Sequence, residues 1–136
     1  MEMQWIDHIA EDRQRELFEF YSKEWWTQGR EFDDVMRMIE QSDIVLGCIS
    51  DEGRLVGFAR VLTDYVFKAM IFDVIVAESS RGQGIGEAIL DKIKGHTALR
   101  NVRSFELYCP DRLIPFYERY GFEKSTSALL RHRPDA

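Results

Sequence analysis

Apolar residues in the first third of the chain recur at helical spacing. They fall on one face over residues 11–26 and again over 32–42, with Gly29 between the two segments. A strand-like stretch over residues 4–9 precedes them. The sequence therefore predicts a short strand followed by two amphipathic helices.

The pattern then changes to runs of β-branched and aromatic residues, which suit a pleated and largely buried surface. The runs over 44–49 and 55–62 flank the turn Asp51-Glu52-Gly53, which predicts an antiparallel hairpin. A further run ends at Val76, and another covers residues 105–109. We expect all four runs to form strands.

Two more helices are predicted among these strands. One begins near Gly84 and ends at Gly95; the start of the next is bracketed by Pro110 and Pro115, and it ends at Gly121. A final hairpin is predicted over residues 122–130, and the residues behind it are expected to fray. Helices and strands in this order indicate an α/β domain.

Length and composition fit one globular domain over residues 1–136. Apolar residues make up 45% of the chain and aromatic residues 12%. The net charge of −6 argues against nucleic-acid binding and favours a cationic partner such as an amine. No apolar run approaches the ~20 residues that span a bilayer, and Glu2 stands where a signal peptide carries a base. We therefore expect a cytoplasmic protein without membrane contact.

The cysteines and histidines show no pattern typical of metal binding. Cys48 and Cys109 are far apart and have apolar neighbours, which predicts free thiols and not a disulfide or a zinc site. The three histidines, at positions 8, 96 and 132, lack ligand spacing. No metal site is predicted.

The hexamer Arg81-Gly82-Gln83-Gly84-Ile85-Gly86 joins the strand that ends at Val76 to the following helix. Three glycines in such a loop let the backbone curl until several N–H groups converge on one spot. The N-terminus of the helix adds its partial positive charge there. The hexamer therefore predicts a binding site for a phosphate-bearing cofactor.

Several known types of glycine-rich loop could account for this hexamer. A Walker loop ends in Gly-Lys-Ser/Thr, whereas Gly86 is followed here by Glu87 and Ala88. A dinucleotide fingerprint spaces its glycines G-x-G-x-x-G, and this loop reads G-x-G-x-G, although Glu106 lies about where the ribose-binding acid would. A structural turn between a strand and a helix is the plainest interpretation.

A family resemblance accounts for the hexamer together with a second block. Arg81-x-x-Gly84-x-Gly86 is similar to the acetyl-CoA loop of the GNAT superfamily of N-acetyltransferases, and PFYERYGF over residues 115–122 resembles that family's late F-Y-x-x-x-G-F helix. The resemblance covers residues 47–122. It implies a single-domain GNAT-like α/β fold, with a central mixed, mostly antiparallel twisted sheet flanked by about four helices, and acetyl-CoA as cosubstrate. The residues implied for cofactor binding are Val74, Ile75, Val76, Arg81, Gly82, Gln83, Gly84, Ile85 and Gly86.

The resemblance also implies a general acid, Tyr117, with Tyr120 as the alternative. A phenol stays protonated at pH 7 and can give its proton to the departing thiolate of coenzyme A. The competing interpretation makes Tyr117 a core aromatic residue, since it shares a helix face with Leu113 and Phe116.

Two carboxylates inside predicted strands are candidates for the general base. Asp73 interrupts the strand that ends at Val76, and Glu106 alternates with apolar residues in the next strand. A carboxylate there is costly to bury unless it meets solvent or a partner. The competing interpretation is a solvent-facing or ion-paired position, with Arg60 as the partner of Asp73. Many members of the family use no single base.

We therefore predict an N-acetyltransferase that moves an acetyl group from acetyl-CoA to a primary amine of a small molecule or a peptide. Neither cysteine lies in the two family blocks, which favours direct transfer in a ternary complex over an acyl-enzyme. The alternatives are a catalytically silent acyl-CoA-binding or interaction module and a small dinucleotide-binding oxidoreductase. The N-terminal helices, including Trp25-Trp26, are expected to form the acceptor side, and exposed strand edges favour a homodimer.

Overall fold

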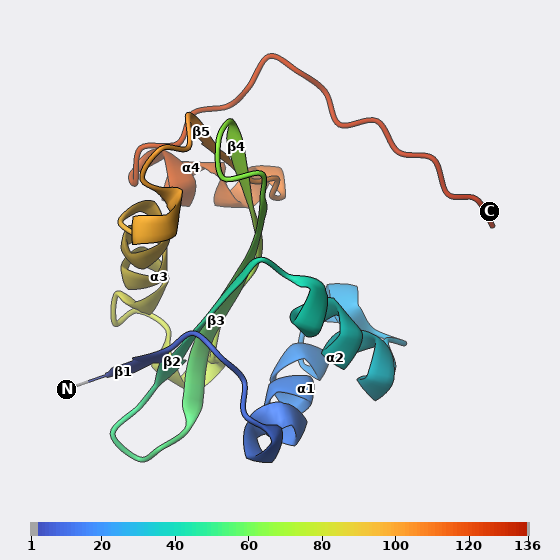
Figure 1. Ribbon diagram of the computed structural model, residues 1–136, viewed down its shortest axis with the longest axis vertical. Coiled ribbons are helices and arrows are strands. Elements are labelled where there is room, and N and C mark those ends of the chain that lie inside the picture. Colours follow the sequence, from blue (N-terminus) through green and yellow to red (C-terminus); the bar gives the residue numbers. More distant parts are fainter. Residues whose placement is uncertain (1–2, 136) are drawn as a thin grey trace.

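The computed structural model describes residues 3–135, which contain one five-stranded sheet with strands in the order β1-β2-β3-β4-β5 (Figure 1). Neighbouring strands are antiparallel except β4 and β5, which are parallel. The predicted mixed, mostly antiparallel sheet is thereby confirmed. The strands are β1 Gln4–Ile6, β2 Ile44–Ile49, β3 Leu55–Thr63, β4 Lys68–Val76 and β5 Ser104–Glu106; the α-helices are α1 Gln14–Ser22, α2 Phe32–Gln41, α3 Ile85–Lys94 and α4 Ile114–Glu118.

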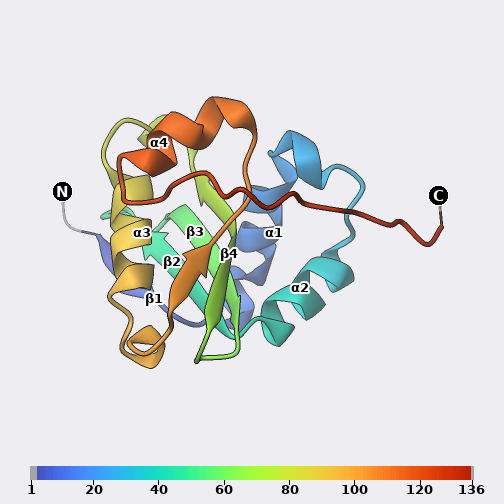
Figure 2. The same cartoon turned by 90° about the horizontal axis from the view of Figure 1, so that it is seen from above.

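The helices cover the two faces of this sheet in pairs (Figures 1 and 2). Helices α1 and α2 lie on one face, and α3 and α4 lie on the other. Because side chains of a strand alternate between faces, the sheet contributes to two separate cores. Phe58 packs with Leu17 on the α1 side, whereas its neighbour Ala59 packs with Ile89 on the α3 side.

The helix predicted over residues 11–26 is interrupted. Helix α1 ends at Ser22, and a separate 3-10 turn follows at Trp25–Thr27. The hydroxyl of the buried Thr27 donates a hydrogen bond of 2.5 Å to the carbonyl oxygen of Tyr21. This bond satisfies one of the carbonyl groups that the end of a helix leaves free. The chain can therefore turn here at low cost, which apolar spacing alone does not reveal.

The two edge strands are shorter than predicted. Strand β1 does not extend over 4–9, and β5 does not reach Cys109. Strand β5 pairs only with the first three residues of β4, from Lys68 to Met70. Beyond Glu106 the chain leaves β4, so no ladder remains to extend the strand.

The hairpin predicted over residues 122–130 is wrong, because none of these residues forms a strand. Residues 123–135, which we call the arm, form an extended trace that crosses over the body in Figure 2 and ends beyond it in both views (Figures 1 and 2). The segment 123–133 contains no glycine, proline or asparagine that would favour a tight reversal.

Among the described residues, no helix is long and apolar enough to cross a membrane.

Candidate active site

Strands β4 and β5 part halfway along β4. Their pairing stops at Met70 and Glu106, whereas β4 continues to Val76. Among the described residues, no strand pairs with the β5-facing edge of β4 over residues 71–76. Backbone N–H and C=O groups along this stretch are therefore available to an extended ligand.

A β-bulge lies within the free stretch of β4. Phe58 pairs with Ile75 and Arg60 pairs with Phe72, so β4 has one residue more than β3 across this interval. Asp73, in the extra stretch, has a φ of +60°. This left-handed conformation is uncommon for a residue with a side chain, and bulges often lie beside active sites.

The glycine hexamer follows directly where β4 ends. Gly82 and Gly84 both have a φ of +80°, and a Cβ atom at either position would meet open space. These glycines are thus required for backbone conformation and not for packing. Among the described residues, no hydrogen bond occupies the amides of residues 82–87, which lie at the N-terminus of the ten-residue helix α3. The loop has the free donors of an anion-binding site.

The other predicted cofactor residues differ in the contacts of their side chains. The Arg81 Nε donates to the carbonyl oxygen of Val76 at 3.2 Å, so its side chain folds back onto β4. Ile85 is buried and anchors the start of α3. A Cβ atom on Gly86 would lie 3.2 Å from the ring of Phe116, which shows how closely α3 approaches α4. Val74 and Val76 pack on the α3 side, and Ile75 packs on the α1 side; Gln83 is exposed.

Tyr117 lies on the α3 side of the sheet and is only 9% exposed. Its ring makes edge contacts with Phe116 and Phe122, at centroid distances of 5.0 and 6.0 Å. Burial, together with the nearby Cys109 thiol, raises the pKa of Tyr117 to about 12. Tyr120 instead donates a long hydrogen bond of 3.4 Å to Glu87. Tyr117 is therefore both a core aromatic residue and a phenol held in its protonated form.

Asp73 is held by two donors on the α1 side. The Tyr21 hydroxyl donates to Asp73 Oδ2 at 2.7 Å, and Arg60 Nε donates to the same oxygen at 2.5 Å. Burial, followed by the charge of Asp73, raises the pKa of the Tyr21 phenol, which therefore remains a donor. The ion pair with Arg60 is the competing interpretation that the sequence offered. The part played by Tyr21 was missed, since its helical spacing marks it only as a core residue.

Glu106 is the last residue of β5 that pairs with β4, at the point where the two strands part. Ser104 Oγ donates to its Oε2 at 3.0 Å, and Lys68 Nζ lies 3.5 Å from its Oε1. Its partner in the ladder is Met70, three residues before Asp73. No hydrogen bond or ion pair joins the two predicted base residues among those that the structure describes. Asp73 is the carboxylate that lies where β4 is free.

The acid and the base candidates thus occupy opposite faces of the sheet. Asp73 contacts Tyr21 of α1, whereas Tyr117 packs with the α3 core. A thioester placed where β4 and β5 part would have the carboxylate on one side and the phenol on the other. Trp26 packs against Tyr21 with ring centroids 6.2 Å apart, and Trp25 is exposed on the same side.

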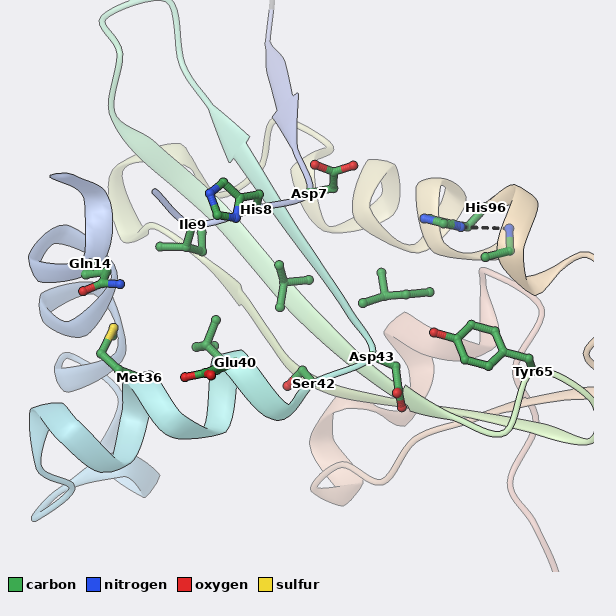
Figure 3. Close-up of a pocket in the computed structure, with 14 residues that line it drawn as sticks. Asp7, His8, Ile9, Gln14, Met36, Glu40, Ser42, Asp43, Tyr65 and His96 are labelled. Atoms are coloured by element: carbon green, nitrogen blue, oxygen red, sulfur yellow. Dashed lines mark hydrogen bonds between the residues drawn. The ribbon is translucent and has the colours of Figure 1, made fainter. Parts of the chain in front are cut away.

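A separate hollow of about 610 Å³ lies at the other end of the sheet (Figure 3). It is lined by Asp7, Glu40 and Asp43, together with His8 and His96. His96 follows the C-terminal end of α3, whereas the glycine loop precedes that helix. None of the predicted site residues lines the hollow, and no group of three potential metal ligands was found among the described residues.

Comparison with known proteins agrees with this geometry. Residues 6–122 match the model of the Acetyltransferase (GNAT) family. Serotonin N-acetyltransferase 2, chloroplastic, of Oryza sativa subsp. japonica is 32% identical over 103 residues, which cover 74% of this chain and 52% of that protein. Histone acetyltransferase TAP1 of Glycine max is 34% identical over 80 residues, which cover 59% of this chain and 35% of that protein.

Similarity to solved structures extends over the whole fold. The crystal structure of a protein from Xanthomonas campestris pv. campestris, described as belonging to the GNAT family of acetyltransferases, matches with a TM-score of 0.83 at 28% identity and covers 98% of this chain and 95% of that one. The chain spans about half the length of the curated relatives it matches, or less. Family model, fold and glycine loop agree, and the chain belongs to the GNAT family of acetyltransferases.

Proposed function

We propose that this chain transfers the acetyl group of acetyl-CoA to a primary amine by direct attack in a ternary complex. The observation that carries the proposal is the set of free amides over residues 82–87, next to the unpaired edge of β4. The two curated relatives are named for serotonin and histone as acceptors, so the acceptor of this chain is stated only as an amine of a small molecule or a peptide.

The glycine loop and β4 divide the binding of acetyl-CoA between them. The amides at the start of α3 bind the pyrophosphate, because free N–H groups and the helix N-terminus both favour an anion there. The backbone of Val74, Ile75 and Val76 pairs with the pantetheine arm in the way that a neighbouring strand would. The acetyl group then lies near the bulge at Asp73.

Each candidate residue then has one proton to move. An amine of pKa ~10.4 is only about 0.04% neutral at pH 7, which costs roughly 4.6 kcal/mol, so a base near the amine helps. The ammonium group first loses one proton to solvent, and Asp73 accepts the second proton from the attacking nitrogen on the α1 side, directly or through a water. The nitrogen attacks the thioester carbon, the carbon–sulfur bond breaks, and Tyr117 gives its proton to the thiolate on the α3 side. Exchange with solvent moves the proton held by Asp73 back to Tyr117, so the products are an amide, coenzyme A and one proton released to solvent.

Ligand binding and turnover test this proposal separately. Thermal unfolding is measured with acetyl-CoA, with free coenzyme A and with a nicotinamide cofactor. A ligand at 100 times its dissociation constant adds about 2.7 kcal/mol of stability. We expect both coenzyme A species to stabilise the protein, and an amine panel to release free thiol. Stabilisation by the nicotinamide cofactor alone would contradict the proposal.

One observation favours the second candidate, a catalytically silent acyl-CoA-binding module. Asp73 Oδ2 already accepts hydrogen bonds from Tyr21 and Arg60, as the carboxylate of a purely structural residue would. Such a module would be stabilised by acetyl-CoA and would release no thiol with any amine of the panel.

A further inference from the structure

Phe72 and Asp73 are neighbours in β4, yet both side chains lie on the α1 side of the sheet. Successive side chains of a regular strand point to opposite faces, but the bulge interrupts this alternation at Asp73, whose φ is +60°. Arg60 contacts both residues: its Nε donates to Asp73 Oδ2, and its guanidinium carbon lies 4.7 Å from the centroid of the Phe72 ring. The bulge therefore places an aromatic ring directly beside the carboxylate that is proposed to accept the proton of the amine.

Tyr108 extends this aromatic surface away from Asp73. Strand β5 ends at Glu106, and Leu107 and Cys109 then pack on the α3 side, whereas Tyr108 contacts Phe72. The two rings meet edge to face, with centroids 5.9 Å apart and an interplanar angle of 87°. Tyr108 is 57% exposed, and Phe72 is partly exposed. Phe72 and Tyr108 thus form an open, nearly right-angled corner where β4 and β5 part, which we call the aromatic corner.

The aromatic corner fits a flat ring on an acceptor with a single amine. Aromatic rings prefer offset-stacked or edge-to-face contacts, and two perpendicular rings allow a third ring to make one contact of each kind. Strands β4 and β5 contain two carboxylates, and each already has a cation beside it, Arg60 at Asp73 and Lys68 at Glu106. A second ammonium group on the acceptor would therefore find no unpaired carboxylate on these two strands.

We infer that the acceptor is an arylalkylamine, whose ring lies in the aromatic corner while its amine reaches Asp73. This inference rests on the proposed function, because it takes Asp73 as the group that receives the amine. Phe72 and Tyr108 then determine specificity, since they bind the ring and move no proton. Their contact with the ring, which lies away from the reacting nitrogen, holds that nitrogen next to the thioester carbon.

A comparison of three amines measures this preference. Thiol release at saturating acetyl-CoA gives kcat/KM for 2-phenylethylamine, for pentylamine with its aliphatic stem, and for ethanolamine with its polar stem. We expect kcat/KM for 2-phenylethylamine to exceed that for pentylamine about 5-fold. It should exceed that for ethanolamine about 10-fold or more, because the ring is removed from water. Turnover of pentylamine or ethanolamine at an equal or higher kcat/KM would overturn the inference and leave the proposed function in place.

One substitution at two exposed tyrosines tests the part played by the aromatic corner. Tyr108→Asn removes one of its rings and should lower the ratio of kcat/KM for 2-phenylethylamine to that for ethanolamine about 5-fold. The matched control is Tyr65→Asn, because Tyr65 is 41% exposed, lines the separate hollow and has a φ of +65° that asparagine tolerates. This control should keep the wild-type ratio, and circular dichroism verifies that both variants are folded. An unchanged ratio in Tyr108→Asn, or an equal fall in both variants, would overturn the inference.

Calorimetry separates a failure of this inference from a failure of the proposed function. 2-Phenylethylamine is titrated into protein saturated with free coenzyme A, so that no acetyl transfer takes place. If no amine releases thiol but 2-phenylethylamine binds, and binds about 5-fold more weakly to Tyr108→Asn, the aromatic corner is supported and the proposed function is contradicted. A protein that neither binds 2-phenylethylamine nor acetylates it would overturn the inference.

Discussion

The ion pair between Arg60 and Asp73 allows a chemical role of Asp73 to be separated from a structural one. The two side chains are only 12% and 9% exposed, and Nε and Oδ2 are 2.5 Å apart. Asp73→Asn keeps the shape of the side chain and tolerates the φ of +60° at the bulge, since asparagine adopts this region readily. Arg60 then stays nearly buried without its counter-charge, a loss that costs about 3 kcal/mol. A domain of this size normally retains its fold after such a loss.

The expected kinetic effect is larger than this structural one. If Asp73 accepts the proton of the amine, Asp73→Asn lowers kcat about 100-fold or more. The KM for acetyl-CoA should change little, because the glycine loop is untouched. Tyr21→Phe is the matched control, since it removes one donor to Oδ2 and leaves the carboxylate and its ion pair in place. We expect it to cost about 1.5–3 kcal/mol of stability, with kcat close to that of the wild type.

Thiol release at saturating acetyl-CoA and urea unfolding provide the two readouts. Asp73→Asn should release thiol far more slowly than the wild type, and Tyr21→Phe should release it at close to the wild-type rate. A near-normal kcat in Asp73→Asn would refute the role of Asp73 as a base. Equal losses of kcat in both variants would show that the geometry of the bulge matters and not proton transfer.

Three further predictions follow from the glycine loop and the buried phenol. Gly84→Ala should lower the free energy of unfolding in urea by about 1–2 kcal/mol, because a φ of +80° strains any side chain even where there is open space. It should also weaken the thermal stabilisation by acetyl-CoA. The control Gln83→Ala, at the exposed neighbouring position, should have neither effect. Tyr117→Phe should lower kcat about 100-fold and leave acetyl-CoA affinity nearly intact, and unchanged turnover would exclude it as the acid. The pKa of Tyr117 is raised from 10.0 to about 12, so its stabilising effect is complete below pH 10 and is lost towards pH 12. That loss is about 3 kcal/mol and should be absent from Tyr117→Phe. An equal fall in the free energy of unfolding between pH 10 and pH 12 in the two proteins would contradict it.

The sequence determined those features that depend on neighbouring residues along the chain. Runs of β-branched and aromatic residues located β2, β3 and the end of β4, and helical spacing located α2 and α3, close to their observed bounds. The glycines of the hexamer predicted a loop whose backbone curls, and Gly82 and Gly84 both have a φ of +80°. These properties are local, because periodicity and backbone preference act within a few residues.

Only the tertiary structure decided which distant residues meet. Tyr21 reaches Asp73 across 52 positions because the register of β3 and β4 places the bulge beneath α1, and no spacing in the sequence encodes that register. The length of β5 depends on where its pairing with β4 stops. The segment predicted to form the last hairpin is instead an extended arm, which pairs with no strand among the described residues. Strand pairing is a contact between segments far apart in the sequence, so its extent is fixed by packing and not by the composition of either segment.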